Sequence, residues 1–277
     1  MVDTVKIVWY NALCEMYGEK RGNNMELWIA EHAKTLIPAL AVMFAAAWTL
    51  RVVIGNKSLK IRMIPIQIIA VLLVLLEIGK QGLSLQQGYD LYHLPFHFCS
   101  LFVFALPIMA FYRGKHRQTV YGVTAALCAA LFLLMLIYPN LIYSAANIRE
   151  FFVDFFSFHT VAFHNLVMLA FVLIAALELH TPAPKGEWKA VVLFTVGFCV
   201  VSSAMAQILQ TNYANFYSCN IPPLEAVRVS LQGVLGYGFT QLLYILIVSA
   251  LNILFVLGAY WVYRFARRLV CKEAVRQ

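Results

Sequence analysis

Residues 119–138 read TVYGVTAALCAALFLLMLIY, a run of 20 residues that contains no charged side chain. Because an α-helix rises about 1.5 Å per residue, a run of this length can cross the roughly 30 Å hydrocarbon core of a bilayer. A transmembrane β-barrel would instead show short segments of alternating polarity. Six further apolar runs have the same character. They lie at Leu36–Ile54, Ile64–Ile78, Leu94–Tyr112, Phe158–Leu179, Trp188–Leu209 and Gly238–Tyr263. The sequence therefore predicts seven transmembrane helices.

Hydrophobic residues make up 62% of the 277-residue chain, and charged residues only 12%. A soluble domain carries about 25% charged residues, so this chain cannot cover a globular surface with charge, and its apolar content excludes disorder. We expect one all-α polytopic membrane domain over residues 1–277, with an N-terminal segment at 1–30, the seven-helix bundle at 31–263 and a basic tail at 264–277. The interrupted apolar stretch Val2–Tyr17 predicts an amphipathic helix in the membrane interface, and no removable signal peptide is expected.

Lysine and arginine residues gather at one end of the predicted bundle. The turns after the first, third and fifth runs and the C-terminal tail hold fourteen basic and three acidic residues, whereas the rest of the chain holds seven basic and ten acidic ones. Cytoplasmic loops of membrane proteins are enriched in Lys and Arg. We therefore expect the N-terminus outside and the C-terminus in the cytosol, in the plasma membrane of a bacterium. Topology and anionic lipids explain the positive charge, so no nucleic-acid partner is expected.

Ionisable side chains at membrane depth are costly and commonly mark functional sites. In this chain they occur at the predicted outer ends of the helices, and none falls at a cytosolic end. They are His32, Glu77, Lys80, His97, Cys99, His159 and His164. Gln207, near the outer end of the sixth run, either lines the same cavity or forms interhelical hydrogen bonds. The pattern predicts one polar pocket near the outer headgroup boundary.

The third run begins LPFHFC at Leu94–Cys99. Proline is favoured at the first helical position, which places Cys99 in the first or second turn, where the helix dipole favours a thiolate. The alternative is that Cys99 packs as a small buried hydrophobe. Residues two apart differ by about 200° around a helix, so His97 and Cys99 can share a pocket only if the first turn is distorted. A base for the thiol is therefore expected from another helix.

Other candidate side chains leave alternatives open. Glu77 and Lys80, at i and i+3, can pair on one helix face, or Glu77 can orient a histidine or bind a cation. His159 and His164 lie about 140° apart around a helix, so only one of them is expected to face the centre. Asp154 either orients His159 or is a solvated loop acid. The remaining cysteines include a possible disulfide pair outside the membrane and residues that pack in mid-span. The pair is Cys14 and Cys219, and the packing residues are Cys128 and Cys199.

Four elements, in order, resemble the YwaF-like integral membrane proteins, whose animal relative is transmembrane protein 164. They are Glu31-His32 before the first run, Glu77 near the end of the second, LPFHFC at Leu94–Cys99 and FVDFFSFH ending at His159. The resemblance covers about residues 25–175. The animal relative is regarded as a phospholipid acyltransferase that uses a cysteine as acyl carrier. The resemblance implies Cys99 as the nucleophile and His159 as its histidine partner, with His97, His32 and Glu77 as further motif positions.

The first hypothesis is a membrane-embedded acyltransferase or acyl hydrolase that acts on phospholipid or lysolipid esters at the outer leaflet. Cys99 would attack the ester carbonyl, His159 would serve as base and then acid, and the amides at the start of the third helix would stabilise the oxyanion. His97 is a further catalytic candidate. The expected substrate-binding residues are Glu77, His32, Lys80, His164 and Gln207. This mechanism needs no cofactor or metal, and a homo-oligomer is possible.

Two other hypotheses belong to different classes. A zinc-dependent lipid hydrolase could draw its ligands from the same histidines, Glu77 and Cys99, although no closely spaced ligand motif is present. A transporter or receptor could use the polar cluster to bind a lipid headgroup or a small solute. Transporters commonly contain repeated halves and broken helices near the midplane, and neither is evident in this sequence.

Overall fold

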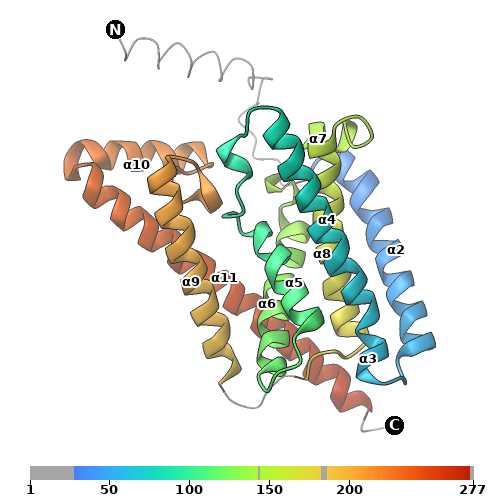
Figure 1. The fold of residues 1–277 in the computed structure, drawn as a ribbon. Helices are drawn as coiled ribbons and strands as arrows, with labels where there is room; N and C mark the ends of the chain where they lie inside the picture. Colours follow the sequence, from blue (N-terminus) through green and yellow to red (C-terminus); the bar gives the residue numbers. More distant parts are fainter. Residues whose placement is uncertain (1–27, 143, 182–185, 275–277) are drawn as a thin grey trace.

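The computed structural model describes residues 28–142, 144–181 and 186–274, and this part of the chain is helical without strands (Figure 1). The α-helices are α2 (Ala30–Ile54), α3 (Leu59–Arg62), α4 (Ile64–Gln86), α5 (Phe102–Phe111), α6 (Arg117–Ile137), α7 (Ala145–Arg149), α8 (Phe155–Ala176), α9 (Glu187–Leu209), α10 (Pro222–Leu235) and α11 (Tyr237–Ala274). Four 3-10 turns are η1 (Leu91–His93), η2 (Cys99–Leu101), η3 (Pro139–Leu141) and η4 (Tyr213–Asn215). The predicted interfacial helix Val2–Tyr17 and the Cys14 partner of the proposed disulfide lie outside the described residues.

Six helical stretches in the described residues are long and apolar enough to cross a membrane. They are Ala30–Ile54, Leu59–Gln86, Arg117–Ile137, Phe155–Ala176, Glu187–Leu209 and Tyr237–Arg268. They correspond to six of the seven predicted runs, because each run supplies the apolar length that a bilayer requires. The fold is therefore the expected polytopic membrane helix bundle.

The third predicted run, Leu94–Tyr112, differs from the others. Its helical part covers only Cys99–Phe111, about 20 Å at 1.5 Å per residue, which is shorter than the hydrocarbon core. The preceding residues form turns around Pro95 rather than the first turns of a regular helix. Irregular backbone at membrane depth is tolerated only where protein satisfies its polar groups. The structure meets this condition with side chains from other elements.

We call residues 91–98 the irregular segment. Three of its carbonyl groups accept hydrogen bonds from distant side chains. The amide of Gln81 in α4 donates to the carbonyl of His93 at 2.7 Å, and the hydroxyl of Ser202 in α9 donates to the carbonyl of Phe96 at 2.8 Å. The hydroxyl of Tyr213 in η4 donates to the carbonyl of Leu91. These bonds hold the segment between α4 and α9, so that it can form one wall of a pocket.

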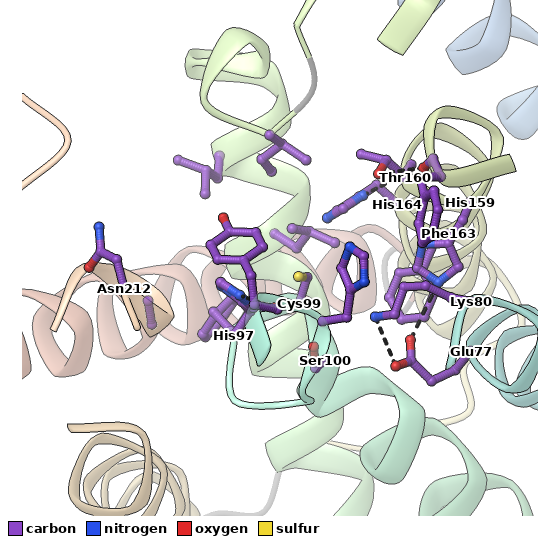
Figure 2. Close-up of a pocket in the computed structure, with 18 of the residues that line it drawn as sticks. Glu77, Lys80, His97, Cys99, Ser100, His159, Thr160, Phe163, His164 and Asn212 are labelled. Carbon is purple, nitrogen blue, oxygen red and sulfur yellow. Dashed lines mark hydrogen bonds and ion pairs between the residues drawn. The ribbon is translucent and has the colours of Figure 1, made fainter. Parts of the chain in front are cut away.

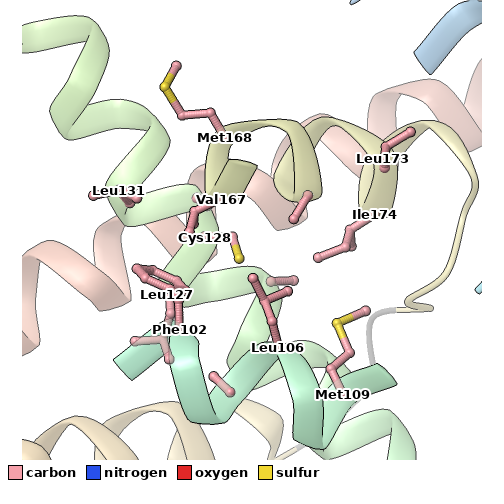
Figure 3. Close-up of a cluster of buried hydrophobic side chains, with 14 of the residues drawn as sticks. Phe102, Leu106, Met109, Leu127, Cys128, Leu131, Val167, Met168, Leu173 and Ile174 are labelled. Atoms are coloured by element: carbon pink, nitrogen blue, oxygen red, sulfur yellow. The ribbon is translucent and has the colours of Figure 1, made fainter. Parts of the chain in front are cut away.

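Helix α6 forms the centre of the bundle and packs against α5, α8, α9 and α11. Figure 3 shows Cys128 of α6 among apolar side chains from α5 and α8. Cys128 is 0% exposed and Cys199 of α9 is also buried, as expected for residues that serve only in packing. The larger neighbours of Cys128 drawn in the figure include Phe102, Leu106 and Val167. This apolar core fixes the rotation of α8 relative to α6.

A cluster of buried polar side chains lies at the end of the bundle where α6 and α9 begin. His180 Nε2 lies 2.6 Å from Glu187 Oε1, the hydroxyl of Tyr260 donates to Glu187 Oε2 at 2.9 Å, and Arg264 donates to the Tyr260 hydroxyl at 2.9 Å. Glu187 is only 3% exposed. We expected no ionisable group at this end of the bundle, and that expectation is wrong. The segment after α8, the start of α9 and the helix α11 pack together here and exclude solvent from His180, Glu187 and Arg264.

Candidate active site

A pocket of about 330 Å³ lies among α4, the irregular segment, α6, α8 and the loop around η4. Six of the eight side chains predicted for the site line it, and Figure 2 shows them around Cys99. They are Glu77, Lys80, His97, Cys99, His159 and His164. The sequence-based prediction that polar helix ends converge is thus matched by the geometry. The wall is completed by apolar side chains and by asparagines near η4.

Both His97 and Cys99 line the pocket, which a regular helix would not allow. The first turn is distorted in the way that the sequence left open: Cys99 begins the 3-10 turn η2, and the residues before it are not helical. The ring nitrogen Nε2 of His97 donates to the carbonyl of Tyr92 at 3.0 Å, and its ring packs against Tyr213. This bond occupies Nε2 of His97 and fixes the orientation of the ring.

Glu77 is the charged centre of one pocket wall. Its Oε1 accepts from Lys80 Nζ at 2.8 Å and from Gln81 Nε2 at 2.7 Å, while its Oε2 lies 3.4 Å from Nε2 of His159 (Figure 2). The predicted pairing with Lys80 and the predicted contact with a histidine are therefore both present. The side chains of this group are about one-tenth exposed, so solvent screens their charges only weakly.

Asp154 does not orient His159. Its carboxylate accepts from the backbone N–H of Ser157 at 2.7 Å and thereby caps the N-terminus of α8. Aspartate is among the preferred residues at this position because its side chain satisfies an amide that has no partner within the helix. The carboxylate that contacts His159 is supplied by α4 instead of the neighbouring loop.

His164 is held differently from His159. Its Nδ1 lies 2.6 Å from the carbonyl of Thr160, so Nδ1 carries the proton and Nε2 is left as an acceptor. In Figure 2 its ring extends from α8 towards Cys99. His159 and His164 both line the pocket, although only one was expected to face the centre. Five residues advance a helix by about 7.5 Å, so a pocket that extends along α8 can contact both rings.

Two predicted site residues are not brought to the pocket. His32 is 0% exposed and accepts at Nδ1 from the backbone N–H of Ile29 at 3.2 Å, at the start of α2. Its ring packs edge-on against Trp28. Gln207 donates to the carbonyl of Phe216 at 3.0 Å and so fastens the loop after α9. Both residues lie at the expected end of the bundle, but their side chains hydrogen-bond to backbone groups there and do not line the pocket.

Several pocket residues were not predicted. His93 lies 2.8 Å from the Ser84 hydroxyl through Nδ1, and its ring stacks on Phe156. Burial lowers the pKa of His93, so this imidazole is neutral near pH 7. The only signal in the sequence was its position directly before the LPFHFC motif. Asparagines 212, 215 and 220 come from the loop around η4, where no periodic pattern marks them.

The arrangement does not resemble a metal centre. Among the described residues, no three histidine, cysteine, aspartate or glutamate side chains are placed to hold a metal ion together. A catalytic zinc site needs about three protein ligands and an open position. The one carboxylate of the group, Glu77, is engaged by Lys80 and Gln81. The donor set therefore does not fit the zinc alternative.

The fold and the pocket define a polytopic helical membrane protein in which a thiol, four imidazoles and a carboxylate–ammonium pair line one cavity. Comparison with protein families matches residues 27–260 to the TMEM164 family. The chain therefore belongs to the TMEM164 family. The match confirms the resemblance seen in the sequence and extends it beyond residue 175, into the last two membrane helices. No curated protein and no solved structure matches the chain.

Proposed function

We propose that the protein is a membrane-embedded acyltransferase or acyl hydrolase that acts on phospholipid or lysolipid esters through an acyl-thioester at Cys99. The observation that carries this proposal is the presence of Cys99, His159 and Lys80 along one pocket, with Glu77 in contact with the latter two. A thiol and a carboxylate-supported imidazole that line one pocket are the groups that nucleophilic acyl transfer uses. The apolar part of the wall suits an acyl chain.

The proposed reaction has two steps. His159 accepts the thiol proton, and Cys99 Sγ attacks the ester carbonyl to form a C–S bond. The C–O bond of the tetrahedral intermediate then breaks, the alcohol leaves with the proton returned by His159, and the acyl group remains on Cys99. In the second step a lysolipid hydroxyl or water gives its proton to His159 and attacks the thioester carbonyl to form a C–O bond. The C–S bond then breaks, and His159 returns the proton to Cys99 Sγ. Donor and acceptor therefore exchange an acyl group without an oxidant or a reductant.

Lys80 is the proposed stabiliser of the oxyanion. The amides at the start of the third helix, which were expected to do this, are partly occupied. The N–H of Ser100 donates to the backbone carbonyl of His97, and the N–H of Leu101 donates to the backbone carbonyl of Phe98. The ammonium group of Lys80 lines the same pocket as Cys99 and extends from Glu77 towards the thiol in Figure 2. A positive charge in a water-poor site stabilises a developing oxyanion strongly.

His159 is proposed as the base in preference to His164. When an imidazole accepts the thiol proton it becomes positively charged, and Glu77 lies 3.4 Å from His159 to stabilise that charge. His164, in contrast, contacts the neutral carbonyl of Thr160. A carboxylate supports an imidazolium better than a neutral dipole does, as in catalytic triads.

Replacing each histidine by asparagine tests this assignment. His159→Asn is expected to lower kcat/KM for acyl transfer by about 10²- to 10⁴-fold, the usual contribution of a general base. His164→Asn is expected to lower it by less than about tenfold, as for a residue that only borders the substrate. The measurement is transfer of a labelled acyl chain in proteoliposomes. If His164→Asn shows the larger loss with normal folding, the base is His164 instead.

The direct test of the proposed function is an acyl adduct on the protein. The purified protein is incubated with phosphatidylcholine carrying a labelled acyl chain and analysed by mass spectrometry after digestion. We expect the acyl mass on the peptide that contains Cys99 and its removal by hydroxylamine, which cleaves thioesters. Cys199, which lies outside the pocket, serves as the internal control and should stay unmodified. Solute flux in proteoliposomes without any adduct would favour a transporter or receptor.

We also propose that the pocket opens on the outer side of the membrane. The pocket lies at the end of the bundle away from the turns that carry most of the Lys and Arg residues. By the positive-inside rule this is the outer side, so the substrates would be lipids of the outer leaflet of a bacterial plasma membrane. Ester carbonyls of glycerolipids lie near the headgroup boundary, at the depth proposed for Cys99.

A further inference from the structure

Helix α10 has its polarity reversed relative to an amphipathic helix of a soluble protein. Its half-buried positions are Glu225, Arg228 and Gln232, which follow each other at i, i+3 and i+7 and face the protein. Every other position is exposed and uncharged, and Val234 is 81% exposed. A surface helix in water turns its apolar stripe inward and its charges outward. The outer surface of α10 is therefore built for an apolar surrounding.

The inward charges of α10 are closely paired. Arg228 Nε donates to Glu225 Oε2 at 2.7 Å, Arg228 Nη1 donates to Gln241 Oε1 at 2.8 Å, and the N–H of Cys219 donates to Glu225 Oε2 at 2.9 Å. These hydrogen bonds lower the pKa of Glu225 and raise the pKa of Arg228, so the pair stays ionised. The two charges of this face are thus paired within the protein itself.

The length and direction of α10 exclude a membrane crossing. Its 14 residues give about 21 Å, which is less than the roughly 30 Å hydrocarbon core. Figure 1 shows α10 lying across the end of α9 and α11 instead of parallel to the bundle. Helix α11 follows α10 directly in the chain, packs against it and crosses the membrane, so the membrane-spanning stretch begins where α10 ends. The side chains that α11 exposes to the bilayer are also apolar, such as Leu242 and Leu246.

From this continuity we infer that α10 is an interfacial helix that rests on the bilayer at the pocket end of the bundle, with Val227 and Val234 inserted among phospholipid acyl chains. Amphipathic helices of this kind insert about 5–10 Å below the headgroups. Here the contact is made by apolar side chains alone, because both charges of the helix are neutralised internally. The contact therefore does not depend on anionic lipid.

The hydrogen bonds of α10 also fix the depth in the membrane of the pocket wall that contains Asn212. Gln241, which Arg228 contacts, donates to the carbonyls of Phe216 and Tyr217 at 3.1 Å. The N–H of Tyr217 donates to Asn212, and Asn212 lines the pocket. An α10 that is inserted in the bilayer therefore holds Asn212 and its part of the pocket wall at the depth of the headgroups. The pocket would then receive its ligand from the bilayer instead of from bulk water.

Photo-crosslinking tests this inference directly. Benzoylphenylalanine is placed at Val234, or at Val227 as an independent position, and the full-length protein is irradiated in phosphatidylcholine vesicles, with and without phosphatidylglycerol. We expect lipid adducts at both positions in both vesicle types. The matched control is Gln232 on the inward face, where the crosslink should form within the same chain. Size-exclusion chromatography before irradiation identifies variants that fold.

Two outcomes would overturn the inference. Crosslinks from Val234 and Val227 to a second copy of the chain would show that this face is a dimer interface. Loss of the lipid adduct at both positions in a folded protein would show that the helix is surrounded by water. Neither outcome depends on the proposed chemistry, because the Cys99→Ala protein should give the same lipid adducts as the native one.

Discussion

Cys99→Ala is expected to abolish acyl transfer while leaving the protein folded and inserted. Without the sulfur no thioester forms, and the remaining groups of the pocket can only position water or a lipid hydroxyl. Losses of this kind in enzymes with a covalent intermediate are large, so we expect a decrease in kcat of at least about 10³-fold. Cys99→Ser, which keeps a weaker nucleophile, should show a loss of similar size, because a hydroxyl gives up its proton much less readily than a thiol.

The matched control is Cys199→Ala. This cysteine is buried in α9, does not line the pocket, and removal of its sulfur leaves the groups around Cys99 unchanged. Labelled acyl transfer is measured for the native protein and the three variants at equal reconstituted amounts, with thermal unfolding in detergent as the test of folding. Full activity in Cys99→Ala would remove Cys99 as the nucleophile and with it the thioester mechanism.

The second large effect is expected at Gly122 in α6, far from the pocket. A Cβ at this position would lie 1.7 Å from Oε1 of Glu187, so Gly122→Ala forces the carboxylate to move. Displacement would break its contacts with His180 and Tyr260 and leave a buried charge poorly paired. Breaking a buried pair typically costs about 3–5 kcal/mol, and we expect the free energy of unfolding to fall by this order.

A glycine in α9 provides the matched control for Gly122. A Cβ on Gly197 meets nothing within 4 Å, and alanine is favoured over glycine in a helix, so Gly197→Ala should be neutral or slightly stabilising. In a Glu187→Ala background the steric conflict is absent, and Gly122→Ala should then add little further cost, which a double-mutant cycle measures. Unfolding is followed in detergent titrations. A Gly122→Ala protein as stable as the native one would contradict the packing described for Glu187.

Much of the site was predictable because it depends on depth in the membrane. Glu77, His97, Cys99 and His159 each lie at an end of an apolar run, and antiparallel crossing helices bring such ends to the same level. The pairing of Glu77 with Lys80 was also predictable, because residues three apart share one face of a helix. Depth alone did not distinguish His32, which lies at the same end but is buried beside Ile29 and Trp28.

Other features of the site depend on rotation and on irregular backbone. The distortion before η2 allows both His97 and Cys99 to face the pocket, and it is held by Gln81 and Ser202 from other helices. No local pattern in the sequence contains those partners. The same holds for Asn212, whose loop is positioned by the contact between α10 and α11.

The sequence by itself determined that this chain crosses a membrane, which family it resembles, and that the ionisable groups of the pocket lie at one level. These properties follow from the length of apolar runs and the cost of charge in hydrocarbon, which act on each segment independently. Only the tertiary structure decided that Glu77 contacts His159, that Glu187 packs on Gly122, and that α10 turns its charges inward. Those contacts join residues far apart in the chain, and their geometry is set by how whole helices rotate and pack against one another.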